Sequence, residues 1–138
     1  MLTGHCFSSC KTGPLISWKS NKQPTVALSS CEAEYVALAA ATRESLYLTR
    51  PINGVDGHYE SCVAFEDHRG TIASSKNSVR HQRSKQIDVR YRFVRTELTE
   101  ANVNILYCPT GETVADVLTK PATKHSLDKF KAYSFGGL

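Results

Sequence analysis

The chain lacks several features that would place it in a well-defined class. No apolar run approaches the roughly 18 residues of a membrane span, and the first residues form neither a charged leader nor an apolar signal core. The five cysteines are an odd number without a Cys-x-x-Cys pair, and the five histidines form no His-x-x-x-His pair. We therefore expect an intracellular protein, in cytoplasm or nucleus, with reduced thiols, no membrane partner and no zinc or haem site.

Length and composition are those of an ordinary globular domain. The 138 residues are 41% apolar and 22% charged, with a formal net charge of +4 and no internal repeat or low-complexity segment. Such a chain is long enough to bury a real core. We expect one domain over residues 1–121, followed by a C-terminal tail, 122–138, that adds a short helix.

Hydrophobic periodicity and turn residues predict a mixed α/β chain. The predicted strands are 4–9, 15–19, 61–66 and 103–107, the first two joined by a turn at 11–14. The predicted helices are 30–49 (stopped by Pro51), 70–75, 85–101, 110–118 and 126–133. Loops are expected at 53–57 and, rich in basic residues, at 76–85.

A carboxylate lies where packing alone would not place it. At helical spacing, Glu34 shares a stripe with small and apolar residues, namely Ala37, Leu38, Ala41, Ser45 and Leu48. Ser29 and Glu32 form a capping box, which gives Glu32 a local structural role that Glu34 lacks. Burying a carboxylate is costly unless a cation or hydrogen-bond donors meet it, so Glu34 indicates metal chemistry. The alternative is that Glu34 lies at the edge of the stripe and reaches water.

Two further acids could join Glu34. Asp67 ends a predicted strand, and Asp116 lies in a helix just past another, and α/β sheets bind ligands near strand ends. Converged carboxylates repel one another and suit Mg²⁺. Alternatively, Asp67 caps the following helix and Asp116 pairs with Lys120 at i, i+4.

A basic segment with interleaved aromatic residues could neutralise nucleic-acid phosphates. Its members are Lys76, Arg80, His81, Arg83, Lys85, Arg90, Arg92 and Arg95. The alternative is a solvated helix face with an ordinary Asp88–Arg92 pair. We expect Trp18 to be a core residue rather than a base-stacking platform, and the cysteines to be packing residues.

The order of several motifs strongly resembles the ribonuclease H region that ends the polyprotein of copia-type long-terminal-repeat retrotransposons. The resemblance rests on residues 16–30, Glu32-Ala33-Glu34-Tyr35, Asp67-His68-Arg69-Gly70-Thr71-Ile72-Ala73, residues 84–95, and Ala115-Asp116-Val117-Leu118-Thr119-Lys120-Pro121. In that family the third motif usually reads D-N-Q-G-A-I-A and the last A-D-I-L-T-K-P. Nearly the whole chain is covered.

The resemblance implies a ribonuclease H-like fold, a mixed sheet flanked by helices. It implies cleavage of the RNA strand of RNA–DNA hybrids with Mg²⁺ or Mn²⁺, and a reverse transcriptase domain in the parental polyprotein. By position, Glu34, Asp67 and Asp116 would be the second, third and fourth metal-binding carboxylates.

The chain also departs from the family pattern. The first carboxylate and the central strand that carries it are expected upstream of the opening hairpin, and the earliest acid here is Glu32. His68-Arg69 replaces Asn-Gln, and Gln86 replaces a histidine. We therefore expect a sheet without its first strand and a weak or inactive enzyme. The alternatives are a non-catalytic nucleic-acid-binding module and a degraded transposon product.

Overall fold

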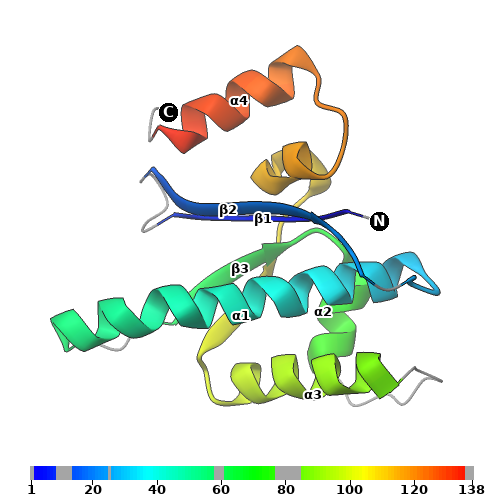
Figure 1. The fold of residues 1–138 in the computed structure, drawn as a ribbon, viewed down its shortest axis with the longest axis vertical. Coiled ribbons are helices and arrows are strands. Elements are labelled where there is room, and N and C mark those ends of the chain that lie inside the picture. The colour runs from blue at the N-terminus through cyan, green and yellow to red at the C-terminus, as the bar shows by residue number, and fades with distance from the viewer. Residues whose placement is uncertain (1, 9–13, 25, 58–60, 77–84, 136–138) are drawn as a thin grey trace. The chain divides into compact units, whose positions relative to one another are not determined.

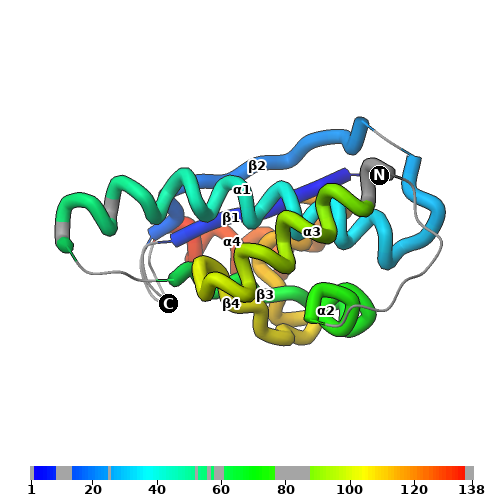
Figure 2. Tube along the Cα trace, turned by 90° about the horizontal axis from the view of Figure 1, so that it is seen from below, coloured from blue at the N-terminus to red at the C-terminus, as the bar shows by residue number. Residues whose placement is uncertain are grey.

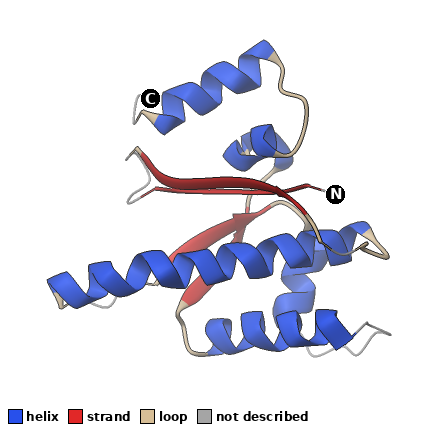
Figure 3. Ribbon diagram, in the orientation of Figure 1, coloured by secondary structure: helices blue, strands red, loops and turns tan. Residues whose placement is uncertain are grey.

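The computed structural model describes residues 2–8, 14–24, 26–57, 61–76 and 85–135, with the backbone alone at 52, 56 and 85–87 (Figure 1). The chain forms two compact units: unit 1 comprises Met1–Val26 and Thr110–Leu138, and unit 2 comprises Ala27–Pro109. Both units contain helices and strands, so the predicted mixed α/β class is confirmed (Figure 3). Their union in a ribonuclease H-like sheet stays a prediction. None of the described helices has the length and apolar character that crossing a membrane requires.

Unit 1 is built on an antiparallel hairpin of β1 (Leu2–Ser8) and β2 (Leu15–Lys22), where both strands were predicted (Figure 1). Of the turn predicted at 11–14, residues 11–13 lie outside the described residues. Gly4 of β1 lies directly against the segment that follows Thr113, and a Cβ there would be 2.8 Å from Leu118 Cβ and 2.7 Å from Thr119 Cγ2. The hairpin therefore depends on glycine at this close approach.

The prediction of an α-helix over 110–118 is wrong. Two short 3-10 helices, η1 (Thr110–Glu112) and η2 (Val114–Leu118), take its place. Glycine and β-branched residues in this stretch weaken an α-helix, and the tighter turns close instead through bonds such as Thr119 N–H to the Asp116 carbonyl at 3.1 Å. α4 (Lys124–Ser134) follows, where a weak helix over 126–133 was predicted.

Unit 2 opens with α1 (Ser30–Asp56), which is longer than predicted. The expected stop at Pro51 is wrong, as is the loop at Asn53-Gly54, because the helix continues through these residues. Pro51 has no N–H to donate to the Tyr47 carbonyl one turn earlier. Both residues are exposed, so water can bind that carbonyl instead. The helix ends instead at Gly57, which has a φ of +67° and donates its N–H to the Asn53 carbonyl at 3.2 Å.

The remaining elements of unit 2 are β3 (Cys62–Glu66), α2 (Arg69–Lys76), α3 (Lys85–Thr99) and β4 (Val103–Tyr107). β3 and β4 pair in parallel, with Glu66 beside Tyr107 at the carboxyl ends of the two strands. α3 packs against α1, as Figure 2 shows. The ends of these strands, with the start of α2, carry the residues discussed below.

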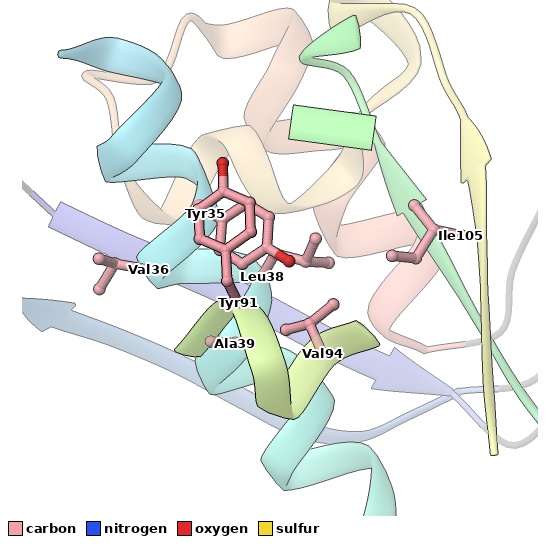
Figure 4. Packing of buried hydrophobic residues seen from close by; sticks show 7 residues of the cluster. All are labelled: Tyr35, Val36, Leu38, Ala39, Tyr91, Val94 and Ile105. Atoms are coloured by element: carbon pink, nitrogen blue, oxygen red, sulfur yellow. The ribbon is translucent and has the colours of Figure 1, made fainter. Parts of the chain in front are cut away.

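The core of unit 2 centres on two stacked tyrosines, Tyr35 of α1 and Tyr91 of α3, with ring centroids 3.7 Å apart and an interplanar angle of 11° (Figure 4). Around them lie Val36, Leu38, Ala39, Val94 and Ile105. Tyr91 and Val94, three residues apart on α3, are both buried in this core.

Burial along α1 differs from the predicted stripe. Of its members only Leu38 and Ser45 are buried; Glu34, Ala37, Ala41 and Leu48 are half-buried. The prediction for Trp18 is also wrong, because its side chain is 62% exposed on β2 rather than part of a core. Aromatic character alone did not reveal which face of the hairpin is covered.

Candidate metal centre

Three carboxylates of unit 2 come together at the carboxyl end of β3. Glu34 lies in the second turn of α1, Glu66 is the last residue of β3, and Asp67 follows it. One carboxylate oxygen from each lies within 4.8 Å of those of the other two. Two of the predicted acids, Glu34 and Asp67, are therefore neighbours, and the third member is one that the sequence analysis missed.

The start of α1 has the capping interactions predicted for Ser29 and Glu32. Ser29 Oγ accepts the Glu32 N–H at 3.1 Å, and Glu32 Oε2 accepts the Leu28 N–H at 2.8 Å. The Glu32 carboxylate is thereby engaged in holding the helix terminus. Glu34, half-buried, meets the other two acids instead.

Glu66 is the most buried member of the cluster, with 8% of its surface exposed. The pKa of its carboxyl group is raised to about 7, first by burial and also by the neighbouring carboxylates Glu34 and Asp67, against a backbone hydrogen bond that lowers it. That bond runs from the His68 N–H to Glu66 Oε1 at 3.0 Å. A signal was present in the sequence: Cys62, Ala64 and Glu66 alternate on one face of the strand, which puts an acid on the core side.

Asp67 does not serve as the cap of α2, the role considered as its alternative. His68 serves instead, with its carbonyl accepting the N–H groups of Thr71 and Ile72 and its Nδ1 accepting that of Thr71 at 3.1 Å. Because His68 satisfies the helix terminus, the Asp67 carboxylate is left for the cluster.

Asp116 belongs to η2 of unit 1. Lys120 Nζ lies 3.2 Å from Asp116 Oδ2, so the i, i+4 pair considered as its alternative is present. Because both side chains are partly exposed, the pair contributes little stability, and a cation could take the place of Lys120 beside Asp116 at low cost. A role for Asp116 in binding metal stays a prediction.

The basic segment is described only in part. Arg80, His81 and Arg83 lie outside the described residues, and Lys85 begins α3 without a described side chain. Lys76, the last residue of α2, and Arg92 of α3 are exposed, whereas Arg90 and Arg95 are half-buried. Within the described part of the chain, Asp88 and Arg92 form no ion pair. Phosphate binding by this segment stays a prediction.

Beside the acids, Arg69 contacts the ring of Tyr107, a contact that the sequence did not predict. The guanidinium carbon of Arg69, the first residue of α2, lies 4.4 Å from the ring centroid of Tyr107, the last residue of β4. Together with Ile72 and Ala73 they line an open cavity of about 400 Å³. No local spacing links residues so far apart in the chain; only the parallel pairing of β3 with β4 brings them together.

Comparison with known proteins gives the class of the relatives: the chain's homologues are retrovirus-related Pol polyproteins from plant transposons. The chain is 36% identical over 129 residues to the polyprotein from transposon TNT 1-94 of Nicotiana tabacum, a match covering 94% of this chain and 10% of that polyprotein. Its identity to those from transposons RE1 and RE2 of Arabidopsis thaliana is 31%, over 83% of this chain and 8% of each polyprotein.

The chain thus spans about a tenth of the length of the curated relatives it matches. No protein-family model matches it, and no solved structure matches it significantly. The homologues support a transposon-derived protein.

Proposed function

We propose that this chain is a ribonuclease H-like domain of retrotransposon origin that binds a divalent cation, Mg²⁺ or Mn²⁺, through Glu34, Glu66 and Asp67. Its substrate class is the RNA strand of an RNA–DNA hybrid. The observation that carries the proposal is the mutual approach, within 4.8 Å, of three carboxylate oxygens from α1 and the end of β3.

The donor set fits a hard cation. Two like charges about 4 Å apart repel by roughly 4 kcal/mol at an effective dielectric of about 20, so three carboxylates held together favour a cation among them. Mg²⁺ prefers carboxylate oxygens and retains several waters for substrate oxygens. The raised pKa of Glu66 expresses the same burial and repulsion, which a bound cation would relieve.

The chain's own residues then have separate tasks. Glu34 and Asp67 supply ligand oxygens, and the His68 N–H orients Glu66 while lowering the energy of its charged form. Asp116 is proposed as a further ligand on the strength of the resemblance. Divalent ions held by these residues would supply activation of a water and stabilisation of the leaving oxygen in phosphodiester cleavage.

Substrate binding is assigned to the basic residues of the α2–α3 region. Exposed Lys76 and Arg92 can contact phosphates directly, and the other basic residues of the segment are proposed to add to phosphate binding. Such contacts are independent of sequence and weaken steeply with salt. The parental polyprotein would add a reverse transcriptase domain, as the resemblance implies.

We propose that turnover by this chain alone is weak. The family pattern uses four carboxylates, of which the chain supplies Glu34, Asp67 and Asp116. Glu32, the earliest acid, is held by the Leu28 N–H in the helix cap. Glu66 is proposed as an additional cation ligand, and by position it does not correspond to the first carboxylate of the family pattern.

The test separates cation binding from catalysis. Titration calorimetry with Mn²⁺ or Mg²⁺ should show binding that Asp67→Asn weakens and that Asp88→Asn, which alters an exposed acid on α3, does not. An RNA–DNA hybrid assay with Mg²⁺ should show slow cleavage that is lost in Asp67→Asn. Cation binding unaffected by Asp67→Asn would overturn the metal site. Hybrid binding that falls with salt, survives chelation and never leads to cleavage would instead establish the non-catalytic binding module.

A further inference from the structure

We propose that Arg69, Ile72, Ala73 and Tyr107 form a binding subsite for a single nucleotide unit, with its base against the Arg69–Tyr107 pair and its phosphate at the guanidinium edge. The choice of ligand class rests on the proposed function. The geometry of the subsite does not depend on a metal ion.

Arg69 is held in a way that leaves its donors available. Its guanidinium lies over the Tyr107 ring, 4.4 Å from the centroid, and the side chain as a whole is exposed. Among the described residues no carboxylate forms an ion pair with it, although Asp67 is only two residues away. A guanidinium with one face on an aromatic ring keeps its other face for stacking and its N–H edge for an anion.

Tyr107 supplies the rigid part of the subsite. It ends β4, is 44% exposed, and stands beside Glu66 in the parallel register. A ring already in contact with the Arg69 guanidinium loses less freedom when a ligand stacks nearby. Its position also puts the subsite next to the carboxylate cluster, within the same unit.

The lining of the cavity favours a nucleotide over a simple anion. Ile72 and Ala73 contribute apolar surface, which a phosphate or sulfate ion would not use but which a planar base would cover. The cavity, about 400 Å³, falls within the range of about 300–1,000 Å³ usual for small-ligand sites. Bases commonly stack on aromatic rings and on arginine planes, and arginine binds phosphate with paired N–H groups.

The experiment is an NMR titration of the full chain with adenosine 5′-monophosphate in EDTA, with adenosine and inorganic phosphate as separate probes. We expect the nucleotide to bind about tenfold more tightly than either fragment, with shifts centred on Arg69, Ile72, Ala73 and Tyr107. Arg69→Gln and Tyr107→Leu should each weaken nucleotide binding about tenfold. Arg43→Gln, which removes an exposed arginine on α1, is the matched control and should leave nucleotide binding unchanged.

A milder variant guards against misfolding. Arg69→Lys keeps the positive charge but loses the planar guanidinium group. This variant should bind phosphate as the wild type does while losing most of the preference for the nucleotide. Equal affinity for phosphate and nucleotide would overturn the proposal and leave an anion site. Absence of nucleotide binding, or a loss of nucleotide binding in Arg43→Gln equal to that in Arg69→Gln, would overturn the proposal too. Because the titration is free of metal, its failure is distinguishable from failure of cation binding, which Asp67→Asn reports.

Discussion

The imidazole Nδ1 of His68 accepts the backbone N–H of Thr71 at 3.1 Å, so a histidine caps the N-terminus of α2. A backbone N–H can only donate, which makes Nδ1 the acceptor and places the ring proton of the neutral side chain on Nε2. The same residue donates its N–H to Glu66. One residue therefore fixes both the start of α2 and the orientation of the buried acid.

Replacing this cap should cost stability in a way that depends on the new side chain. His68→Ala should lower the free energy of unfolding by about 1 kcal/mol, because the Thr71 N–H loses its side-chain acceptor. His68→Asn should retain most of it, because asparagine is among the best N-cap residues. Urea unfolding followed by circular dichroism measures both, and equal stability of the two variants would contradict the capping role.

Glu66 should make stability fall as pH rises. Its pKa is about 7 in the folded chain against 4.5 for an ordinary glutamate, so between these values the folded state holds a proton that the unfolded state has released. The contribution of Glu66 to stability is therefore most favourable below about pH 4.5 and declines up to about pH 7, by on the order of 3 kcal/mol. Glu66→Gln should remove this decline.

The measurement is urea unfolding at several pH values in EDTA, which keeps divalent cations from masking the effect. Wild type and Glu66→Gln should diverge between pH 5 and pH 7, the variant being the more stable above. Parallel pH profiles would show that Glu66 titrates normally. Addition of Mg²⁺ at pH 8 should stabilise the wild type, since a ligand that binds the folded state shifts unfolding.

Gly4 should be intolerant of a side chain. A Cβ at this position would lie under 3 Å from atoms of Leu118 and Thr119, so Gly4→Ala should destabilise unit 1 by about 1–3 kcal/mol through overpacking. Gly111→Ala is the matched control, because a Cβ there would meet nothing within 4 Å. Thermal unfolding of the two variants checks the prediction, and equal melting temperatures would contradict it.

Replacing Gly54 by alanine should stabilise the protein, in contrast to the same change at Gly4. It lies inside α1, and a Cβ there would have no neighbour within 4 Å. Gly54→Ala should therefore raise the free energy of unfolding by about 0.5–1 kcal/mol, because alanine loses less backbone freedom in a helix. A lower stability in urea would mean that this part of α1 is not helical in solution.

Local rules predicted the elements that depend on local interactions. The cap at Ser29 and Glu32 and the bounds of β4 at Val103–Tyr107 could be read directly from the sequence. Pro51 misled because an exposed proline interrupts one hydrogen bond without ending a helix, whereas Gly57 with its positive φ does end it. Helix and strand periodicity therefore gave the class, and single residues decided the boundaries.

The site was only partly predictable because its members meet through tertiary pairing. Glu34 and Asp67 could be named from a helix stripe and a strand end, but Glu66 looked like the close of an apolar strand. The contact of Arg69 with Tyr107 needs the parallel pairing of β3 and β4, which no short window contains. Asp116 lies in unit 1, and its place beside the other acids remains a prediction.

The make-up of unit 1 determines the order in which the protein can fold during synthesis. Ser8 Oγ and Tyr133 Oη form a hydrogen bond at 3.0 Å although they are 125 positions apart, and Gly4 rests on residues of η2. The opening hairpin therefore leaves the ribosome long before the elements that complete its unit, whereas unit 2 is continuous from Ala27 to Pro109. We expect nascent chains to form the carboxylate cluster of unit 2 first, and chains cut short after Pro109 to leave β1 and β2 without their packing surface.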